Sequence, residues 1–170
     1  MNFNMKITTE IIINKPVLTV WEIVGNQFGS AHIWASALTH TEGSGRKMAE
    51  QVCENRICDI KGMGRIREKL LEFDAKIFVL TYEVMNGFPF FVERGINRWT
   101  MTEEGSSTRL QSVAEITTRG FVGMLMAPLM KMQMTGLMRN LLEDLKHYVE
   151  TGVPHPRKVK ALSSRKQIRA

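Results

Sequence analysis

Four charged residues in the middle of the chain could do acid–base or anion-binding chemistry. Glu68, Glu83 and Arg98 fall on predicted strands, where an inward-pointing side chain could polarise a carbonyl group. Arg56 and Arg98 could each hold an acidic head group through two parallel hydrogen bonds. The alternative is that these side chains are solvated or paired across neighbouring strands. Alternation along a strand does not decide between the two, because a β-bulge shifts the parity.

The sequence contains no motif for a metal or a cofactor. Neither HExxH nor a pair of CxxC motifs is present, and the four histidines are scattered: His32, His40, His147 and His155. A GxGxxG turn, a Walker loop and a GxSxG elbow are also absent. We therefore predict that the protein uses no cofactor and no metal.

Two cysteines, Cys53 and Cys58, are five residues apart on one predicted strand. This spacing places them on opposite faces, so we expect two free thiols, as suits a reducing cytoplasm. The N-terminus has only a short apolar run with no charged region before it, which predicts neither a signal peptide nor a membrane span.

The net charge of +6 belongs to the end of the chain. The last 18 residues contain six Lys and Arg residues and no acid, which leaves residues 1–152 with balanced charge. We expect one ligand-binding domain over 1–152 and a basic, disordered tail over 153–170 that is dispensable for folding. A basic tail can also contact nucleic acid, anionic lipid or an acidic protein, but we expect no nucleic-acid partner.

The hydrophobic pattern predicts an α+β fold in the order strand, two short helices, six strands, long helix. Pro16 suits the start of the first short helix, which Gly25 should stop, and Asn26 could cap the second. The long helix covers 121–149, with a kink or a short preceding helix near Pro128. Short connections, one of them at 43–45, indicate an antiparallel meander of these strands: 5–14, 37–42, 49–59, 65–73, 76–85, 92–102 and 107–118.

A curved seven-stranded sheet wrapped around one long helix can leave an apolar space between them. Six of the 12 methionines fall between Met124 and Met138, and their flexible thioethers could either adapt to a ligand or simply form core. Asn97, Trp99 and Met101 share one strand face, which puts Arg98 on the outer face. We predict these ligand-binding residues, with Trp34 near the mouth: Trp34, Leu38, Tyr82, Phe91, Trp99, Met101, Met130, Met134 and Met138.

Three strings give the chain a family resemblance: KPVLTVWEIVGNQFG near the start, GMGRIREKLLEFD followed by LTYEVMNGFPF in the middle, and NRWTMTEEGSSTRL before the last strand. Over about residues 3 to 150 the chain resembles the SRPBCC or START-like superfamily, which includes the polyketide cyclase/dehydrase and lipid-transport families. The resemblance implies a helix-grip fold with an internal cavity whose mouth is flanked by His32 and His40. It supplies no universal catalytic motif, because members bind lipids, hormones and polyketides and some are enzymes.

Two main hypotheses follow for the function. The first is a cytoplasmic binding or carrier protein for a small hydrophobic ligand, such as a lipid, a polyketide or an aromatic molecule. The second is a cyclase or dehydratase-type enzyme in which His32, His40 or an inward carboxylate acts as the base, and it requires at least two polar side chains converging in the cavity. A third is an interaction protein whose basic tail binds an acidic partner.

Overall fold

The computed structural model describes residues 2–168, with side chains for residues 2–163. Within that part of the chain, one strand precedes three short helices, six more strands and two helices. The strands are β1 (Asn2–Ile13), β2 (Leu38–Ala49), β3 (Val52–Ile60), β4 (Gly64–Asp74), β5 (Val79–Val84), β6 (Val92–Glu104) and β7 (Ser107–Arg119). The helices are α1 (Val17–Trp21), η1 (Glu22–Asn26), η2 (Phe28–Ile33), α2 (Gly120–Thr151) and α3 (Pro156–Ile168).

The seven strands form one antiparallel sheet in the order β1-β7-β6-β5-β4-β3-β2. Strands β2 to β7 follow one another as a meander. Strand β1 pairs with β7 and forms one edge of the sheet, and β2 forms the other. The sheet and the long C-terminal helix confirm the predicted α+β, helix-grip fold.

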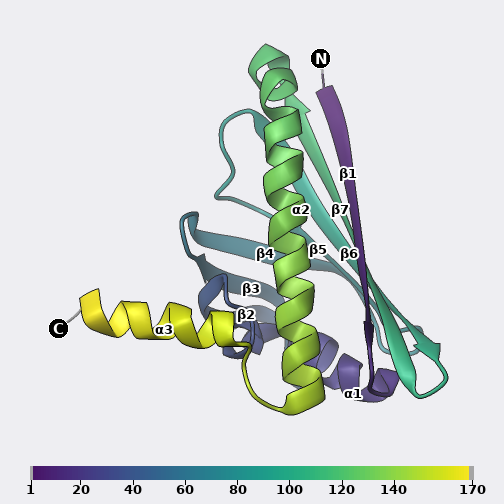
Figure 1. Ribbon diagram of the computed structural model, residues 1–170. Helices are drawn as coiled ribbons and strands as arrows, with labels where there is room; N and C mark the ends of the chain where they lie inside the picture. The colour runs from purple at the N-terminus through teal and green to yellow at the C-terminus, as the bar shows by residue number, and fades with distance from the viewer. Residues whose placement is uncertain (1, 169–170) are drawn as a thin grey trace.

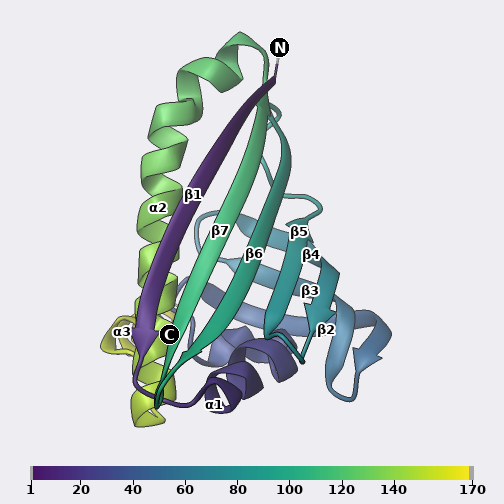
Figure 2. The same ribbon diagram turned by 90° about the vertical axis from the view of Figure 1, so that its right-hand side faces the viewer.

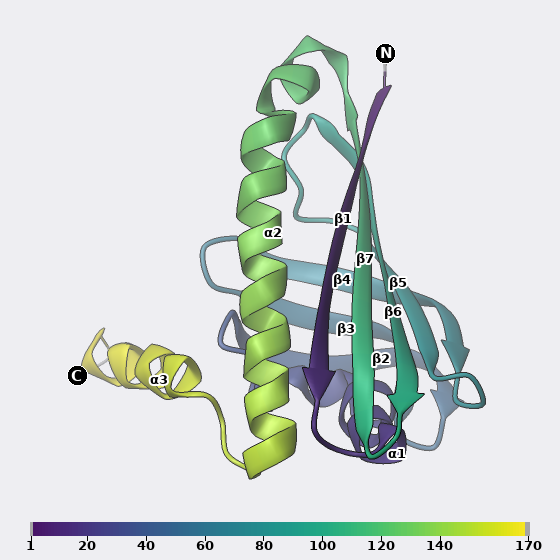
Figure 3. The same cartoon turned by 45° about the vertical axis from the view of Figure 1, so that its right-hand side comes forward.

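The sheet is strongly bent around α2. In Figure 1, β1 and β7 run nearly along α2, whereas β3 and β4 cross behind it at a steep angle. Figure 2 and Figure 3 show the same bend from the side, with α2 closest to β1. Because α2 packs mainly along β1 and β7, the inner face of the middle strands is left further from the helix. The bend therefore creates the space in which the candidate site lies.

The short helices close one end of this space. Val17, Val20 and Trp21 are buried, as the helical spacing predicts. Gly25 does not stop the helix, which continues to Asn26 as a wider turn; instead Gly25 makes room for the Trp21 ring, since a Cβ there would lie 2.5 Å from it. Asn26 does not cap the next helix either, because its side chain donates to Glu22 Oε2 at 2.6 Å.

The turn predicted at 43–45 is wrong. Strand β2 continues to Ala49 with an irregular register between Ser44 and Lys47, and the hairpin turn lies at Glu50 and Gln51. Gly45 has a φ of 82°, a conformation that serves a β-bulge as well as a turn, so glycine alone did not distinguish the two.

Helix α2 is continuous through Pro128, and its first turns bend away from the axis of the rest (Figure 2). The methionines divide between its faces. Met138 is buried and Met130 and Met134 are partly buried, whereas Met124 and Met132 are exposed. The methionine stripe is therefore not a single ligand-facing surface.

The tail differs from the predicted disordered segment. Pro156 to Ile168 form α3, whose first turn docks on the domain, as the contacts of two cations show. Arg157 Nη1 donates to Asp144 Oδ1 at 2.9 Å, and the buried Lys158 donates to the carbonyl of Leu38 at 2.6 Å. Charge composition could not reveal this, because it does not show which residue of another element each cation contacts. Residues 169–170 lie outside the described residues.

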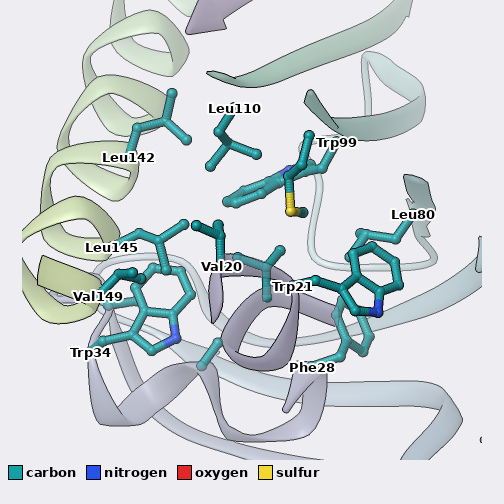
Figure 4. Packing of buried hydrophobic residues seen from close by; sticks show 14 of the residues in the cluster. Val20, Trp21, Phe28, Trp34, Leu80, Trp99, Leu110, Leu142, Leu145 and Val149 are labelled. Carbon is teal, nitrogen blue, oxygen red and sulfur yellow. The ribbon is translucent and has the colours of Figure 1, made fainter. Parts of the chain in front are cut away.

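Two clusters of buried side chains stabilise the fold. The larger joins the short helices, the inner sheet face and the last turns of α2; Figure 4 shows Trp99 and Leu110 opposite Leu142 and Leu145. The smaller joins β1, β6 and β7 to the first half of α2, and it includes Ile7. None of the helices in the described part of the chain is long and apolar enough to span a membrane.

Candidate functional site

A line of polar side chains crosses the inner face of the sheet, from β3 to β7. Strand register places Arg56 opposite Glu68 and Tyr82 opposite Asn97, and Asn97 hydrogen-bonds to Ser112 on β7. All five residues are buried. Buried polar groups are costly unless they are hydrogen-bonded, so their partners decide what this face can do.

Arg56 and Glu68 form a buried ion pair. Arg56 Nε donates to Glu68 Oε2 at 2.6 Å, and Nη1 donates to the carbonyl of Phe28 at 2.8 Å. The guanidinium carbon lies 3.9 Å from the centroid of the Phe28 ring and 5.5 Å from that of Tyr82, so two aromatic faces also contact the cation. Burial alone would lower the pKa of Arg56, but the Glu68 carboxylate outweighs it and the pKa is raised. The pair is therefore a fixed, charge-balanced unit.

Cys58 contacts the same carboxylate as Arg56. Its Sγ lies 3.4 Å from Glu68 Oε2 and donates to it. Burial raises the pKa of the Cys58 thiol to about 12, and Glu68 adds to this while Arg56 opposes it. The residue is therefore a protonated thiol at neutral pH and not a nucleophile. Both cysteines are free, as predicted.

A second polar group lies across β5, β6 and β7. Asn97 Nδ2 donates to Tyr82 Oη at 3.0 Å, and Ser112 Oγ donates to Asn97 Oδ1 at 2.8 Å. Nδ2 also lies 3.6 Å from the sulfur of Met138, which reaches down from α2. Burial raises the pKa of Tyr82, with a further contribution from Glu68, so its hydroxyl is neutral. Asn97 is thus held by the sheet and has both ends of its amide occupied.

Two cavities lie on either side of Tyr82. The first, of about 30 Å³, is named here the Trp99 cavity and lies at the end closed by the short helices; its lining includes Phe28, Trp34, Arg56, Tyr82 and Trp99. The second, of about 80 Å³, is named the Glu68 cavity and lies between the middle strands and α2; its lining includes Ile66, Glu68, Tyr82, Asn97, Ala114, Met134 and Met138. The lining of the Glu68 cavity is apolar apart from Glu68, Tyr82 and Asn97.

The predicted ligand-binding residues divide between these places. Trp34, Leu38 and Trp99 line the Trp99 cavity, Met134 and Met138 line the Glu68 cavity, and Tyr82 lines both. The other three line neither. Met101 is buried in the larger core cluster, and Phe91 and Met130 pack against the smaller one.

The remaining candidates for chemistry lie outside the cavities. Glu83 pairs with Arg94 at 2.8 Å on the outer face, and Arg98 is exposed there, as the alternation predicts. His32 Nδ1 lies 2.6 Å from Thr41 Oγ1, and His40 is exposed beside Glu42. Among the described residues, no group of three or more His, Cys, Asp and Glu side chains could hold a metal ion.

Sequence reasoning did not assign a role to Asn97 or Ser112. Alternation along the strand predicts that Asn97 shares the face of Trp99, and this is the available sequence signal for a polar residue inside. Ser112 lies opposite Trp99 in the register, which requires the strand pairing to be known.

The bent sheet, the long helix across it and the internal site define a helix-grip domain of the START-like type. The sequence profile described as polyketide cyclase / dehydrase and lipid transport matches residues 4–150, and the chain belongs to this family. No curated protein matches the sequence.

Solved structures share the fold at low sequence identity. A START superfamily protein from Mycobacterium smegmatis is 14% identical, with a TM-score of 0.71 over 85% of this chain and 97% of that one. A protein from Thermus thermophilus is 20% identical, with a TM-score of 0.69 over 85% and 97%. A truncated norcoclaurine synthase from Thalictrum flavum is 12% identical, with a TM-score of 0.69 over 88% and 96%.

Proposed function

We propose that the protein binds a small, largely apolar molecule, such as a lipid, a polyketide or an aromatic compound, between the sheet and α2. The observation that carries the proposal is the Glu68 cavity, an apolar hollow beside fixed polar groups and the larger of the two cavities that flank Tyr82. Its volume of about 80 Å³ is small beside the roughly 300–1,000 Å³ of ordinary ligand sites. The flexible side chains of Met134 and Met138 in its wall can move aside to enlarge it.

Replacement of Met134 by Trp tests the proposal. The indole would fill the Glu68 cavity, so binding of the neutral dye Nile red, measured by its fluorescence, should fall sharply while the protein remains folded. Met132→Trp is the matched control, because Met132 is exposed on the outer face of the same helix and should leave dye binding unchanged. No dye response in the parent protein, together with a loss of about 1–3 kcal/mol in Met134→Trp, would show that the space is filled core.

A second candidate function is proton transfer to or from a bound ketone. It is favoured by the polar side chains Arg56, Glu68 and Asn97 at the cavities, since the enzyme hypothesis requires at least two that converge. Exchange of the α-protons of 2-tetralone in deuterated buffer, followed by NMR, checks it. Exchange that is faster than in buffer and is abolished in Glu68→Gln would support the enzyme hypothesis. Exchange at the buffer rate would exclude it and leave only the binding function.

A further inference from the structure

The two oxygens of the Glu68 carboxylate have different surroundings. The three donors that reach the group, Arg56 Nε, Arg56 Nη2 and Cys58 Sγ, all contact Oε2. Oε1 accepts no hydrogen bond from any side chain or backbone group in the described part of the chain. The residue is only 5% exposed and lines the Glu68 cavity. One carboxylate oxygen of a largely buried residue therefore has acceptor capacity left beside an apolar hollow.

The other side-chain acceptors of that cavity already receive a hydrogen bond. Asn97 uses its Nδ2 on Tyr82 and its Oδ1 on Ser112. Tyr82 Oη accepts from Asn97. The remaining lining consists of Gly95 and apolar side chains. Glu68 Oε1 is thus the group in this cavity best placed to take a hydrogen bond from a ligand.

We infer that the ligand carries a neutral hydroxyl group, as an alcohol or a phenol, which donates to Glu68 Oε1 while its apolar body fills the Glu68 cavity. The inference rests on the proposed function and names the ligand class for that site. A ligand carbonyl or carboxylate would bring its own lone pairs against Oε1. An ammonium group would add a net charge to a pair that Arg56 has already balanced, and burying an unbalanced charge is costly.

The size of the hollow agrees with a ligand whose hydroxyl-bearing end enters first. About 80 Å³ is less than the cavity of about 150 Å³ that binds benzene in an engineered protein core. Met63, in the exposed turn between β3 and β4, belongs to the lining together with Leu137 of α2, so the cavity reaches the surface beside them. The ligand body would extend past these two residues.

The test compares 2-naphthol with naphthalene by isothermal titration calorimetry. The hydroxyl is the difference between the two probes, and a hydrogen bond to a charged acceptor predicts that the parent protein binds 2-naphthol about tenfold more tightly or better. In 2-methoxynaphthalene the oxygen cannot donate, so this probe should show no such gain. Binding of 2-naphthol and naphthalene with equal affinity would overturn the inference and leave the proposed function standing. Binding of none of the three would overturn the proposed function itself.

Two variants assign the preference to Glu68. Glu68→Gln replaces one carboxylate oxygen by a donor, and Arg56→Met/Glu68→Leu removes the pair together, which keeps the interior free of an unpaired charge. Each should bind naphthalene and lose the preference for 2-naphthol. The control Arg98→Met/Glu72→Leu removes an ion pair on the outer face. This variant should keep the preference for 2-naphthol. A preference that survives in the folded double variant of the inner pair would also overturn the inference.

Discussion

Two Arg–Glu pairs share strand β4 and lie on opposite faces of the sheet. The inner pair joins Glu68 to Arg56, and its side chains are 7% and 9% exposed. The outer pair joins Glu72 to Arg98, and its side chains are 38% and 45% exposed. Thr81 donates to the outer carboxylate at 2.9 Å, in an arrangement that water can replace. The same residue types thus make a rigid polar unit inside and an exchangeable contact outside.

The two glutamates occupy opposite faces because the strand is irregular between them. Glu68 and Glu72 are four residues apart, and simple alternation would place both inside. The β4–β5 register shifts between Leu70 and Glu72, so Leu71 is exposed and Phe73 packs against Trp21 in the core. One extra residue in the strand therefore decides which carboxylate faces the cavity.

The largest expected effect is the loss of one partner from the inner pair. Glu68→Leu leaves the Arg56 guanidinium buried without its carboxylate, and we expect the free energy of unfolding to fall by about 3–5 kcal/mol. Urea unfolding followed by circular dichroism measures it. Arg56→Met/Glu68→Leu should recover most of the loss, since apolar side chains of similar size remove both charges together. A double variant as unstable as Glu68→Leu would show that the pair itself stabilises the fold.

More of the fold than of the site could be predicted from the sequence, because the fold depends on hydrophobic periodicity and turn residues within each segment. The short connections and the alternation along the strands predict the meander. The long run of apolar residues at helical spacing predicts α2. The error at Gly45 arose where one residue type serves two backbone conformations. The docking of Arg157 on Asp144 joins residues in different elements, and a single sequence carries no record of such a contact.

For the site, the decisive facts were strand parity and pairing. The sequence predicts that Glu68 could point inward and that Arg56 could hold an acidic head group, but the pairing of the two side chains depends on the β3–β4 register. Met101 shares a face with Trp99, as predicted, yet it lies where the core is filled. Which part of an inner face borders a cavity depends on the distance to α2, and the hydrophobic pattern does not contain that distance.

A third ion pair, of intermediate burial, gives the next largest effect. Arg157 is one-third exposed and Asp144 is 1% exposed, and Asp144 also accepts from the backbone N–H of Ser36 at 2.8 Å. Arg157→Ala would leave this carboxylate with a weaker set of partners, and we expect a loss of about 2 kcal/mol in the free energy of unfolding.

Exposed Val159 on the same helix supplies the control, and Val159→Ala should cost less than about 0.5 kcal/mol. Truncation after Gly152 should cost at least as much as Arg157→Ala. An unchanged melting temperature after truncation would support the dispensable tail predicted from its charge and would count against a stabilising role for the contact.

A smaller effect is expected from pH through His32. Burial lowers the pKa of His32, with further contributions from His40, whose ring centroid lies 5.8 Å away, and from Lys158. Since its folded-state pKa lies below the unfolded value of about 6.5, the unfolded chain binds the extra proton more readily. Stability from this group is present above pH 6.5 and is lost as the pH falls below it. Urea midpoints at pH 7.5 and 5.5 measure the loss, which should shrink in His32→Gln; an identical loss in that variant would assign it to other groups.

The smallest effect is expected from the outer pair. Arg98→Gln removes the ion pair with Glu72. Water can solvate both partners in its place, because both side chains are more than one-third exposed. Exposed ion pairs contribute about 0–1 kcal/mol, and added salt weakens them. We therefore expect a loss of less than about 1 kcal/mol in urea unfolding at low salt and a smaller one in 1 M sodium chloride. Arg56→Gln, measured in the same two buffers, should lose several-fold more and show little dependence on salt, because its partner is shielded from the solvent. A loss of equal size at the two positions would mean that burial does not set the difference between the two faces of β4.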